Sequence, residues 1–350
     1  MTMTDLTEAE IQLLIVLIEL AQPQETPNNN HYRFYPRTVE EAAAYFKSFR
    51  QDWTDAYASL ETRGLIQPAE SAYRLTSQGI RIACQVRDER PPIYYWYKEF
   101  YTLTATSRAY ATFCERLYGK NLCQAGFSDM EQIEKLFDVI QPGQDSRILD
   151  IGCGTGMVAE YLADQTGARV WGVDYSPEAI QQALDRTQAK HDRPDFSVAN
   201  MDTLDFADES FDTIISIDTL YMPADLEATL RKLMAMLRPG GQLAVFYSHA
   251  VWDASRDRTT LLPANTPLGV ALRNLGLAFR TWDLTEQTYR LMQHKRQIGE
   301  EMRQAFEVEG NQALFDFIVA ESEASSAPFD LQTCTQSRFL YHVCKRGREC

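Results

Sequence analysis

Short apolar runs alternate with amphipathic stretches through the middle of the chain. The apolar runs have the length and β-branched content of strands, and the stretches between them have the spacing of helices with one buried face. The strands are predicted at 147–151, 168–174, 195–199, 211–217 and 241–247, and the helices at 157–165, 177–190 and 224–236. Strands separated by helices indicate a parallel sheet with right-handed crossovers, which is an α/β fold. Such sheets bind ligands at the carboxyl ends of their strands.

Residues 1–90 follow a different pattern, which predicts a small α+β domain. Thr7-Glu-Ala-Glu10 is a capping box that opens one helix, and Thr38-Val-Glu-Glu41 opens a second, through residue 49. A third helix is predicted at 53–63, and a hairpin at 65–76 follows it. Three helices and a hairpin occur in this order in winged helices, and L-E-T-R-G-L-I followed by Y-R-L-T-S-Q-G resembles that family.

The rest of the chain divides into a connector and a larger domain. Residues 91–127 are rich in aromatic side chains and predict a helical connector, and residues 128–350 carry the alternating pattern after a capping box, Ser128-Asp-Met-Glu131. The segment 250–328 is longer than a crossover needs and predicts a helical lid insertion. Its helical patterns lie at 267–279 and 284–306, and two last strands, expected to complete the sheet as an antiparallel pair, lie at 329–335 and 338–345.

The first strand of the larger domain runs into a glycine-rich turn, Arg147-Ile-Leu-Asp-Ile-Gly-Cys-Gly-Thr-Gly156. Glycines at spacing G-x-G-x-G before a helix leave backbone N–H groups bare, so that a ligand can lie against them. The next strand ends at Asp174, about twenty residues on, where a nucleoside ribose would present its hydroxyls. Close packing of strand and helix also selects glycine, and the acid at the second strand end makes a nucleoside site the better prediction.

The run D-I-G-C-G-T-G followed by G-V-D-Y-S resembles the class I S-adenosylmethionine-dependent methyltransferases, whereas a dinucleotide dehydrogenase would carry G-x-G-x-x-G. Later strands match the family in order, including a P-G-G turn at 239–241. The resemblance implies a doubly wound Rossmann-like sheet, mainly parallel with an antiparallel C-terminal strand, and S-adenosyl-L-methionine as the cofactor. It also implies that Asp174 binds the ribose and Asp202 the adenine amine. The other cofactor-binding residues implied are Asp150, Gly152, Cys153, Gly154, Gly156, Tyr175, Asn200, Met201, Ile217 and Asp218.

Three residues are candidates for catalysis, and no metal site is predicted. His249 follows the fifth strand, and a histidine there has a pKa suited to removing a proton from a hydroxyl or amine acceptor. A loop histidine without a catalytic role is an equal alternative. Tyr221, after the fourth strand, lies where acceptor contacts are found in the family. Tyr118-Gly119 resembles a pair near the methionine end of the cofactor, and packing of an aromatic helix between domains is the alternative.

The residues after the fourth strand bear on the methyl acceptor. Methyltransferases of nucleobase amines would carry Asp or Asn before Pro-Pro there, and this chain has Asp218-Thr-Leu-Tyr221 instead. The aromatic connector and lid suit an apolar or ring-bearing metabolite. We therefore predict methylation of a small molecule, with O, N and C left open as the methylated atom. The alternatives are a winged-helix DNA-binding regulator that senses S-adenosylmethionine, and a protein methyltransferase.

Charge argues against a nucleic-acid partner. The formal net charge is -15, and nucleic-acid affinity comes largely from Lys and Arg that neutralise phosphates. Residues 1–90 hold nine basic and thirteen acidic side chains, and the helix that would read DNA carries Asp52, Asp55 and Glu61 with only Arg63 in return. Winged-helix units serve as dimerisation arms in many small-molecule O-methyltransferases. The resemblance therefore implies that this domain forms a homodimer or shields the substrate.

Composition also bears on location. The longest apolar run, Ile11 to Leu20, is half of the roughly 20 residues that a membrane span needs. The first ten residues lack the basic segment of a signal peptide. None of the seven cysteines forms a C-x-x-C pair, so that zinc and iron–sulfur sites are not indicated. We expect a cytoplasmic protein that is not associated with a membrane.

Overall fold

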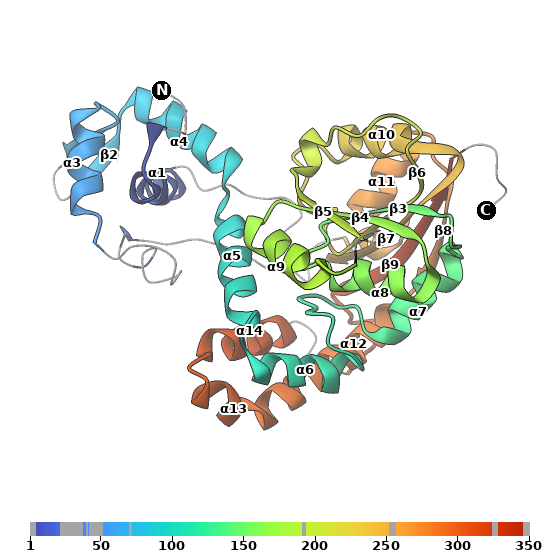
Figure 1. Cartoon of the computed structure of the whole chain (residues 1–350). Helices are drawn as coiled ribbons and strands as arrows, with labels where there is room; N and C mark the ends of the chain where they lie inside the picture. Colours follow the sequence, from blue (N-terminus) through green and yellow to red (C-terminus); the bar gives the residue numbers. More distant parts are fainter. Residues whose placement is uncertain are drawn as a thin grey trace. The chain divides into compact units, whose positions relative to one another are not determined.

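The computed structural model of the chain describes residues 5–21, 38, 39, 41, 52–69, 72–190, 194–251, 257–323 and 328–345. The chain forms two compact units, Met1–Phe100 and Tyr101–Cys350, and the division falls within helix α5 (Pro92–Thr104). Figure 1 shows the elements of each unit in the order of the chain. Among the described residues, no helix is both long enough and apolar enough to cross a membrane.

The first unit contains the elements that the sequence predicts, as far as it is described. Helix α1 (Glu8–Ala21) begins with the capping box: the Thr7 N–H donates to the Glu10 carboxylate at 2.7 Å, and the Glu10 N–H donates to the Thr7 hydroxyl at 3.3 Å. The predicted helix at 38–49 lies almost wholly outside the described residues. The winged helix therefore stays a prediction. The later elements are α3 (Thr54–Thr62), the antiparallel hairpin β1 (Ile66–Ala69) and β2 (Ala72–Leu75), and α4 (Ser77–Glu89), which was not predicted.

The second unit contains one seven-stranded sheet in the order β5-β4-β3-β6-β7-β9-β8. The first five strands in this order are parallel, and β9 runs antiparallel to both of its neighbours. This arrangement confirms the predicted Rossmann-like α/β fold, with an antiparallel strand near one edge. The strands are β3 (Arg147–Ile151), β4 (Arg169–Asp174), β5 (Asp195–Val198), β6 (Phe211–Ile217), β7 (Leu237–Ala250), β8 (Phe279–Asp283) and β9 (Gln336–Cys344).

Helices cover both faces of this sheet, so that its central strands are buried on both sides (Figure 1). One face packs on α7 (Met130–Ile140), α8 (Met157–Thr166) and α9 (Pro177–Thr187). The other face packs on α10 (Leu226–Met236) and α11 (Pro267–Asn274). Parallel strands between two helical layers read as continuous apolar runs, which is why they were recognisable in the sequence.

The last strand pair differs from the prediction. Residues 329–335 do not form a strand, because Asp330 starts a turn in which its carboxylate accepts the Gln332 N–H at 2.8 Å. The edge strand is instead β8, which lies between the two predicted helices. Its inner neighbour β9 confirms the strand predicted at residues 338–345, and it is buried along most of its length.

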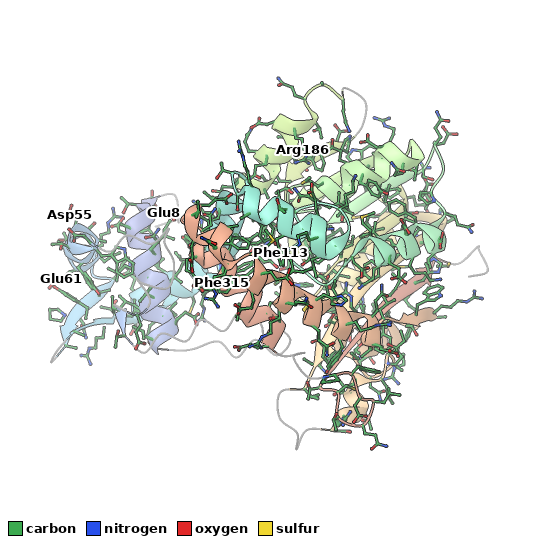
Figure 2. All side chains as sticks on the ribbon, turned by 90° about the horizontal axis from the view of Figure 1, so that it is seen from below. Glu8, Asp55, Glu61, Phe113, Arg186 and Phe315 are labelled. Carbon is green, nitrogen blue, oxygen red and sulfur yellow. The ribbon has the colours of Figure 1, made fainter. Side chains whose placement is uncertain are left out.

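The segment 250–328 is not helical throughout. Helix α11 belongs to the layer over the sheet, because Leu268 and Leu272 are fully buried in the same cluster as Phe211 and Leu230. The remaining helices form a separate cluster in which the Phe306 ring lies 6.4 Å from the rings of both Phe113 and Phe315 (Figure 2 labels the last two). This cluster consists of α6 (Arg108–Tyr118), α12 (Thr285–Glu301), α13 (Arg303–Val308) and α14 (Gln312–Glu323).

Candidate functional site

Each glycine of the loop after β3 leaves room for a different neighbouring residue. Gly152, Gly154 and Gly156 all have positive φ, at +71°, +56° and +71°. A Cβ on Gly152 would lie 2.2 Å from the methyl group of Thr219, and one on Gly154 would lie 2.7 Å from the Tyr101 hydroxyl. A Cβ on Gly156 would overlap the Phe196 ring. Gly156 therefore serves the packing of β5 on the loop, and Gly152 and Gly154 bring the loop close to other parts of the site.

Asp174, at the end of β4, organises this loop. Its carboxylate accepts the Gly154 N–H at 2.9 Å and the Ser176 N–H at 2.9 Å, and the Gly152 N–H donates to the Val173 carbonyl at 2.8 Å. Burial raises the pKa of Asp174 to about 6, and burial together with the charge of Asp174 raises the pKa of Asp150 to about 7. Both acids therefore lie buried beside the loop at the predicted strand ends.

The predicted adenine residue, Asp202, lies on the surface in a 3-10 turn after β5. The Asn200 side chain caps this turn by accepting the Asp202 N–H at 2.9 Å. The Asp202 carboxylate accepts the Ala224 N–H at 3.2 Å and the Thr229 hydroxyl at 3.3 Å, so that it ties the turn to the start of α10. Met201 packs against the core below. Cys153 and Tyr175 are partly buried beside the ends of β3 and β4.

Asp218, just after β6, has a partner that the sequence did not predict. Its carboxylate forms a two-pronged ion pair with the guanidinium of Arg338 on β9, with Nη2 to Oδ2 at 3.0 Å. Arg338 is fully buried. The signal for Arg338 in the sequence was a basic residue next to the apolar run Phe339-Leu-Tyr341, since a charge buried there requires a partner.

The two candidates for contacting the acceptor lie near this pair. The Tyr221 hydroxyl donates to Asp218 at 3.0 Å and accepts the Ser248 N–H at 2.7 Å. Burial and the Asp218 carboxylate raise the pKa of Tyr221 well above its ordinary value, so that it stays a neutral phenol. His249 is partly buried at the end of β7, opposite Ser337 on β9, and burial lowers its pKa. At neutral pH, His249 is therefore a free base.

Tyr118 lies deeper than the sequence suggested. Its ring is 1% exposed, and its hydroxyl donates to the Gly126 carbonyl at 3.0 Å and accepts from Lys295 at 3.3 Å. Lys295 is itself fully buried and forms an ion pair with Glu321 on α14. Tyr118 is thus part of the polar interior of the helical cluster in this structure.

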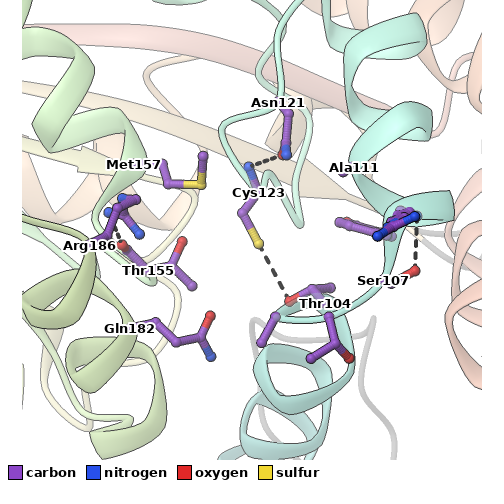
Figure 3. Close-up of a pocket in the computed structure, with 13 residues that line it drawn as sticks. Thr104, Ser107, Ala111, Asn121, Cys123, Thr155, Met157, Gln182 and Arg186 are labelled. Carbon is purple, nitrogen blue, oxygen red and sulfur yellow. Dashed lines mark hydrogen bonds between the residues drawn. The ribbon is translucent and has the colours of Figure 1, made fainter.

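A cavity of about 340 Å³ opens beside the glycine loop (Figure 3). Polar groups from three sides line it: Thr104 and Cys123 from the segment around α6, Thr155 from the loop, and Arg186 from α9. Arg186 donates to the Thr155 carbonyl at 2.6 Å, and the Cys123 thiol donates to the Thr104 hydroxyl at 3.5 Å. Thr155 belongs to the glycine-rich turn, and the sequence analysis predicted none of the named lining residues as a site residue.

The residues at these strand ends fit S-adenosylmethionine in their position and chemistry. The glycine loop lies at the carboxyl ends of parallel strands, where such sheets bind ligands, and its Gly152 and Gly154 make room for Thr219 and Tyr101. The Asp174 carboxylate accepts the backbone N–H groups of Gly154, Ser176 and Tyr175, and about one of its four lone-pair sites remains for a ribose hydroxyl. No group of three or more His, Cys, Asp or Glu side chains suited to a metal ion occurs in the part of the chain that the structure describes.

The sheet order, the glycine loop and the acid at the end of β4 give this part of the chain the fold of class I, S-adenosylmethionine-dependent methyltransferases. More particularly, residues 148–241 match the family described as "Methyltransferase domain". The chain is 36% identical to Methyltransferase GfsG of Streptomyces halstedii over 126 residues, which are 35% of this chain and 44% of that protein. It is 34% identical to phosphoethanolamine N-methyltransferase 1 of Arabidopsis thaliana over 133 residues, which are 37% and 26% of the two chains.

Solved structures agree with this fold. Phosphoethanolamine N-methyltransferase 2 of Haemonchus contortus, in complex with phosphomonomethylethanolamine and S-adenosylhomocysteine, superposes with a TM-score of 0.59 at 17% identity. The superposition covers 78% of this chain and 62% of that one. Because the matches span less than half of the two curated relatives, they define the domain and not the acceptor.

Proposed function

We propose that the chain transfers a methyl group from S-adenosylmethionine to a small molecule. The observation that carries the proposal is the bond from the Gly154 N–H to the Asp174 carboxylate at 2.9 Å, which joins the two halves of a nucleoside site at adjacent strand ends. The cavity beside Thr155, at about 340 Å³, is in the size range of small-ligand sites, but neither His249 nor Tyr221 lines it, so the proposal does not rest on it.

Each residue of the site has a proposed role toward the cofactor. The loop from Gly152 to Gly156 lies under the methionine end, Asp174 binds the ribose, and Asp202 lies near the adenine. The cofactor supplies a methyl group on a sulfonium, which is already a good leaving group. The chain therefore mainly aligns the acceptor and excludes water.

His249 and Tyr221 act on the acceptor side in this proposal. A hydroxyl or protonated amine acceptor must lose a proton as the carbon–oxygen or carbon–nitrogen bond forms. The free-base state of His249, favoured by burial, suits it to take that proton. Tyr221, held by Asp218 and Ser248, offers a neutral phenol for orienting the acceptor. Tyr118 would act there only after its bonds to Gly126 and Lys295 are released.

The relatives support a small acceptor without fixing the methylated atom. Several of the similar proteins are phosphoethanolamine N-methyltransferases, and another is a 27-O-demethylrifamycin SV methyltransferase. These names include both N- and O-methylation. We therefore propose a small-molecule acceptor without naming the methylated atom. Methylation of a protein would contradict this part of the proposal.

The first experiment is calorimetric titration with S-adenosylmethionine and S-adenosylhomocysteine, followed by methyl transfer from labelled cofactor to a panel of small acceptors. Micromolar binding of both is expected, and Asp174→Asn should weaken it at least tenfold. Asp195→Asn, an exposed acid on the neighbouring strand β5, is the matched control and should bind as the wild type does. Absence of binding to the wild-type protein would overturn the proposal.

A further inference from the structure

The side chain of Arg338 uses all of its hydrogen-bond donors within the second unit. Its five guanidinium N–H groups donate to Gln132 at 2.9 Å, Ser248 at 2.9 Å, Ser128 at 2.7 Å and both carboxylate oxygens of Asp218. The guanidinium also lies over the rings of Phe127 and Phe246, at 5.5 Å and 5.1 Å from their centroids. A buried arginine with all five donors satisfied is held in one orientation.

The partner of this arginine is held in an unfavourable backbone conformation. Asp218 has a φ of +57°, a left-handed backbone conformation that residues other than glycine rarely adopt. Such conformations persist only where surrounding contacts fix them. The Phe127 N–H adds a longer contact to Asp218 at 3.4 Å. Arg338 thus helps to keep the Asp218 turn in place, together with the bond from the Asp218 N–H to the Phe246 carbonyl at 3.3 Å.

The same turn forms one wall of the glycine loop. Thr219 donates to the Ile151 carbonyl at 2.7 Å, and its methyl group fills the space that a side chain on Gly152 would need. On the other side of the turn, Asp218 accepts the hydroxyl of Tyr221. One carboxylate therefore links the cofactor loop with the candidate acceptor residue.

We propose that Arg338 is a positioning residue of the methyltransferase site, and this rests on the proposed function. Through Asp218, it holds the Asp218-Thr219 turn against Gly152 and orients Tyr221, so that the cofactor pocket is formed before the ligand binds. Stability alone does not explain why Arg338 and Asp218 form a buried ion pair, because an apolar pair of the same volume often stabilises a core as well. A lysine would keep the charge and lose the two-pronged geometry.

The test compares Arg338→Lys, Arg338→Met and Asp218→Asn for S-adenosylhomocysteine affinity and for the KM and kcat of methyl transfer. Arg338→Met leaves a buried carboxylate without its partner and could fail to fold. Asp218→Asn then still allows the test, because Asn tolerates the left-handed conformation that this turn requires. Val343→Ala, a fully buried position on the same strand outside this network, controls for lost stability.

We expect each Arg338 variant to lose at least tenfold in affinity within the folded fraction, while Val343→Ala keeps the wild-type affinity. The effects of Arg338→Met and Asp218→Asn should not add in the double variant, because both break the same contact. Wild-type affinity in Arg338→Lys and Asp218→Asn, with only the unfolding midpoint lowered, would overturn this assignment alone. A wild-type protein that binds neither cofactor form would overturn the proposed function, and this assignment with it.

Discussion

Asp150 and Asp174 lie on neighbouring strands, and the structure keeps both largely out of water. Each carboxyl ionises less readily than in solution because burial disfavours the charged form, and the negative charge of Asp174 raises the pKa of Asp150 further. A raised pKa in the folded state means that the folded protein keeps a proton that the unfolded chain has already released. Ionising these two carboxyls therefore destabilises the ligand-free protein, and a cationic ligand beside them would reduce this destabilisation.

Replacing Asp150 by asparagine should change how stability depends on pH. The pKa of Asp150 rises from 3.8 to about 7 on folding, so the wild-type protein loses stability as pH rises between about 4 and 7. Asp150→Asn lacks this titration and should gain about 2–4 kcal/mol over the wild type at pH 8, and nearly nothing at pH 4. Urea unfolding across this range measures the difference. The exposed acid Asp145 provides the control, as Asp145→Asn, and a constant gain at every pH would contradict the prediction.

At this scale, the sequence predicted the residues whose partners are close along the chain. The glycine loop and Asp174 are separated by about twenty residues, and a motif with fixed spacing can record their contact. Arg338 was missed because its partners Ser128, Asp218 and Ser248 lie 210, 120 and 90 residues away. The predicted capping box misled for a related reason: Asp129 caps α7, and Ser128 serves Arg338 instead.

Among the elements, the parallel strands were predictable and the edge of the sheet was not. Strands covered by helices on both faces give unbroken apolar runs, whereas β8 has partly exposed positions throughout and only five residues. Its position between two helical patterns, at 267–279 and 284–306, made it resemble the end of a helix. Helix α11 was assigned to a lid for the same reason, since an amphipathic pattern records that a face is buried and not what covers it.

The assignment of α11 to the sheet layer predicts a stability effect. Leu272 is fully buried against the sheet, so Leu272→Ala should lower the free energy of unfolding by about 2–4 kcal/mol. Val270, on the same helix and 36% exposed, is the control, and Val270→Ala should stay within about 0.5 kcal/mol of the wild type. Denaturant unfolding measures both. Equal stability of the two variants would indicate that α11 does not close the core.

For the molecule as a whole, the acidic balance extends to the element that a DNA-binding winged helix would use. Asp55 and Glu61 are exposed on α3, where Figure 2 labels them. The one basic residue there, Arg63, pairs with Glu10 at 3.3 Å and donates to the Asp5 carbonyl at 3.0 Å. These contacts argue against DNA binding, and dimerisation or shielding of the substrate by the first unit stays a prediction.

We therefore expect no binding to a random-sequence DNA duplex at low salt, up to about 10⁻⁴ M protein, which is the weak end of non-specific DNA binding. Fluorescence anisotropy of a labelled duplex measures it. The combined variant Asp55→Lys and Glu61→Lys should gain detectable affinity, which shows that the assay responds to charge on α3. Salt-sensitive DNA binding by the wild-type protein would contradict this prediction and favour the alternative of a winged-helix DNA-binding regulator.

The place of β9 in the sheet also constrains how the protein is made. This strand lies between β7 and β8, although it follows both of them along the chain. During synthesis on the ribosome, β7 and β8 must wait as unpaired edges until residues 336–344 have emerged. Arg338 arrives with that strand, so the turn beside the glycine loop receives its counter-ion late. The ligand site is therefore completed only after residues 336–344 have been synthesised, and nascent chains halted before this strand should lack a complete site.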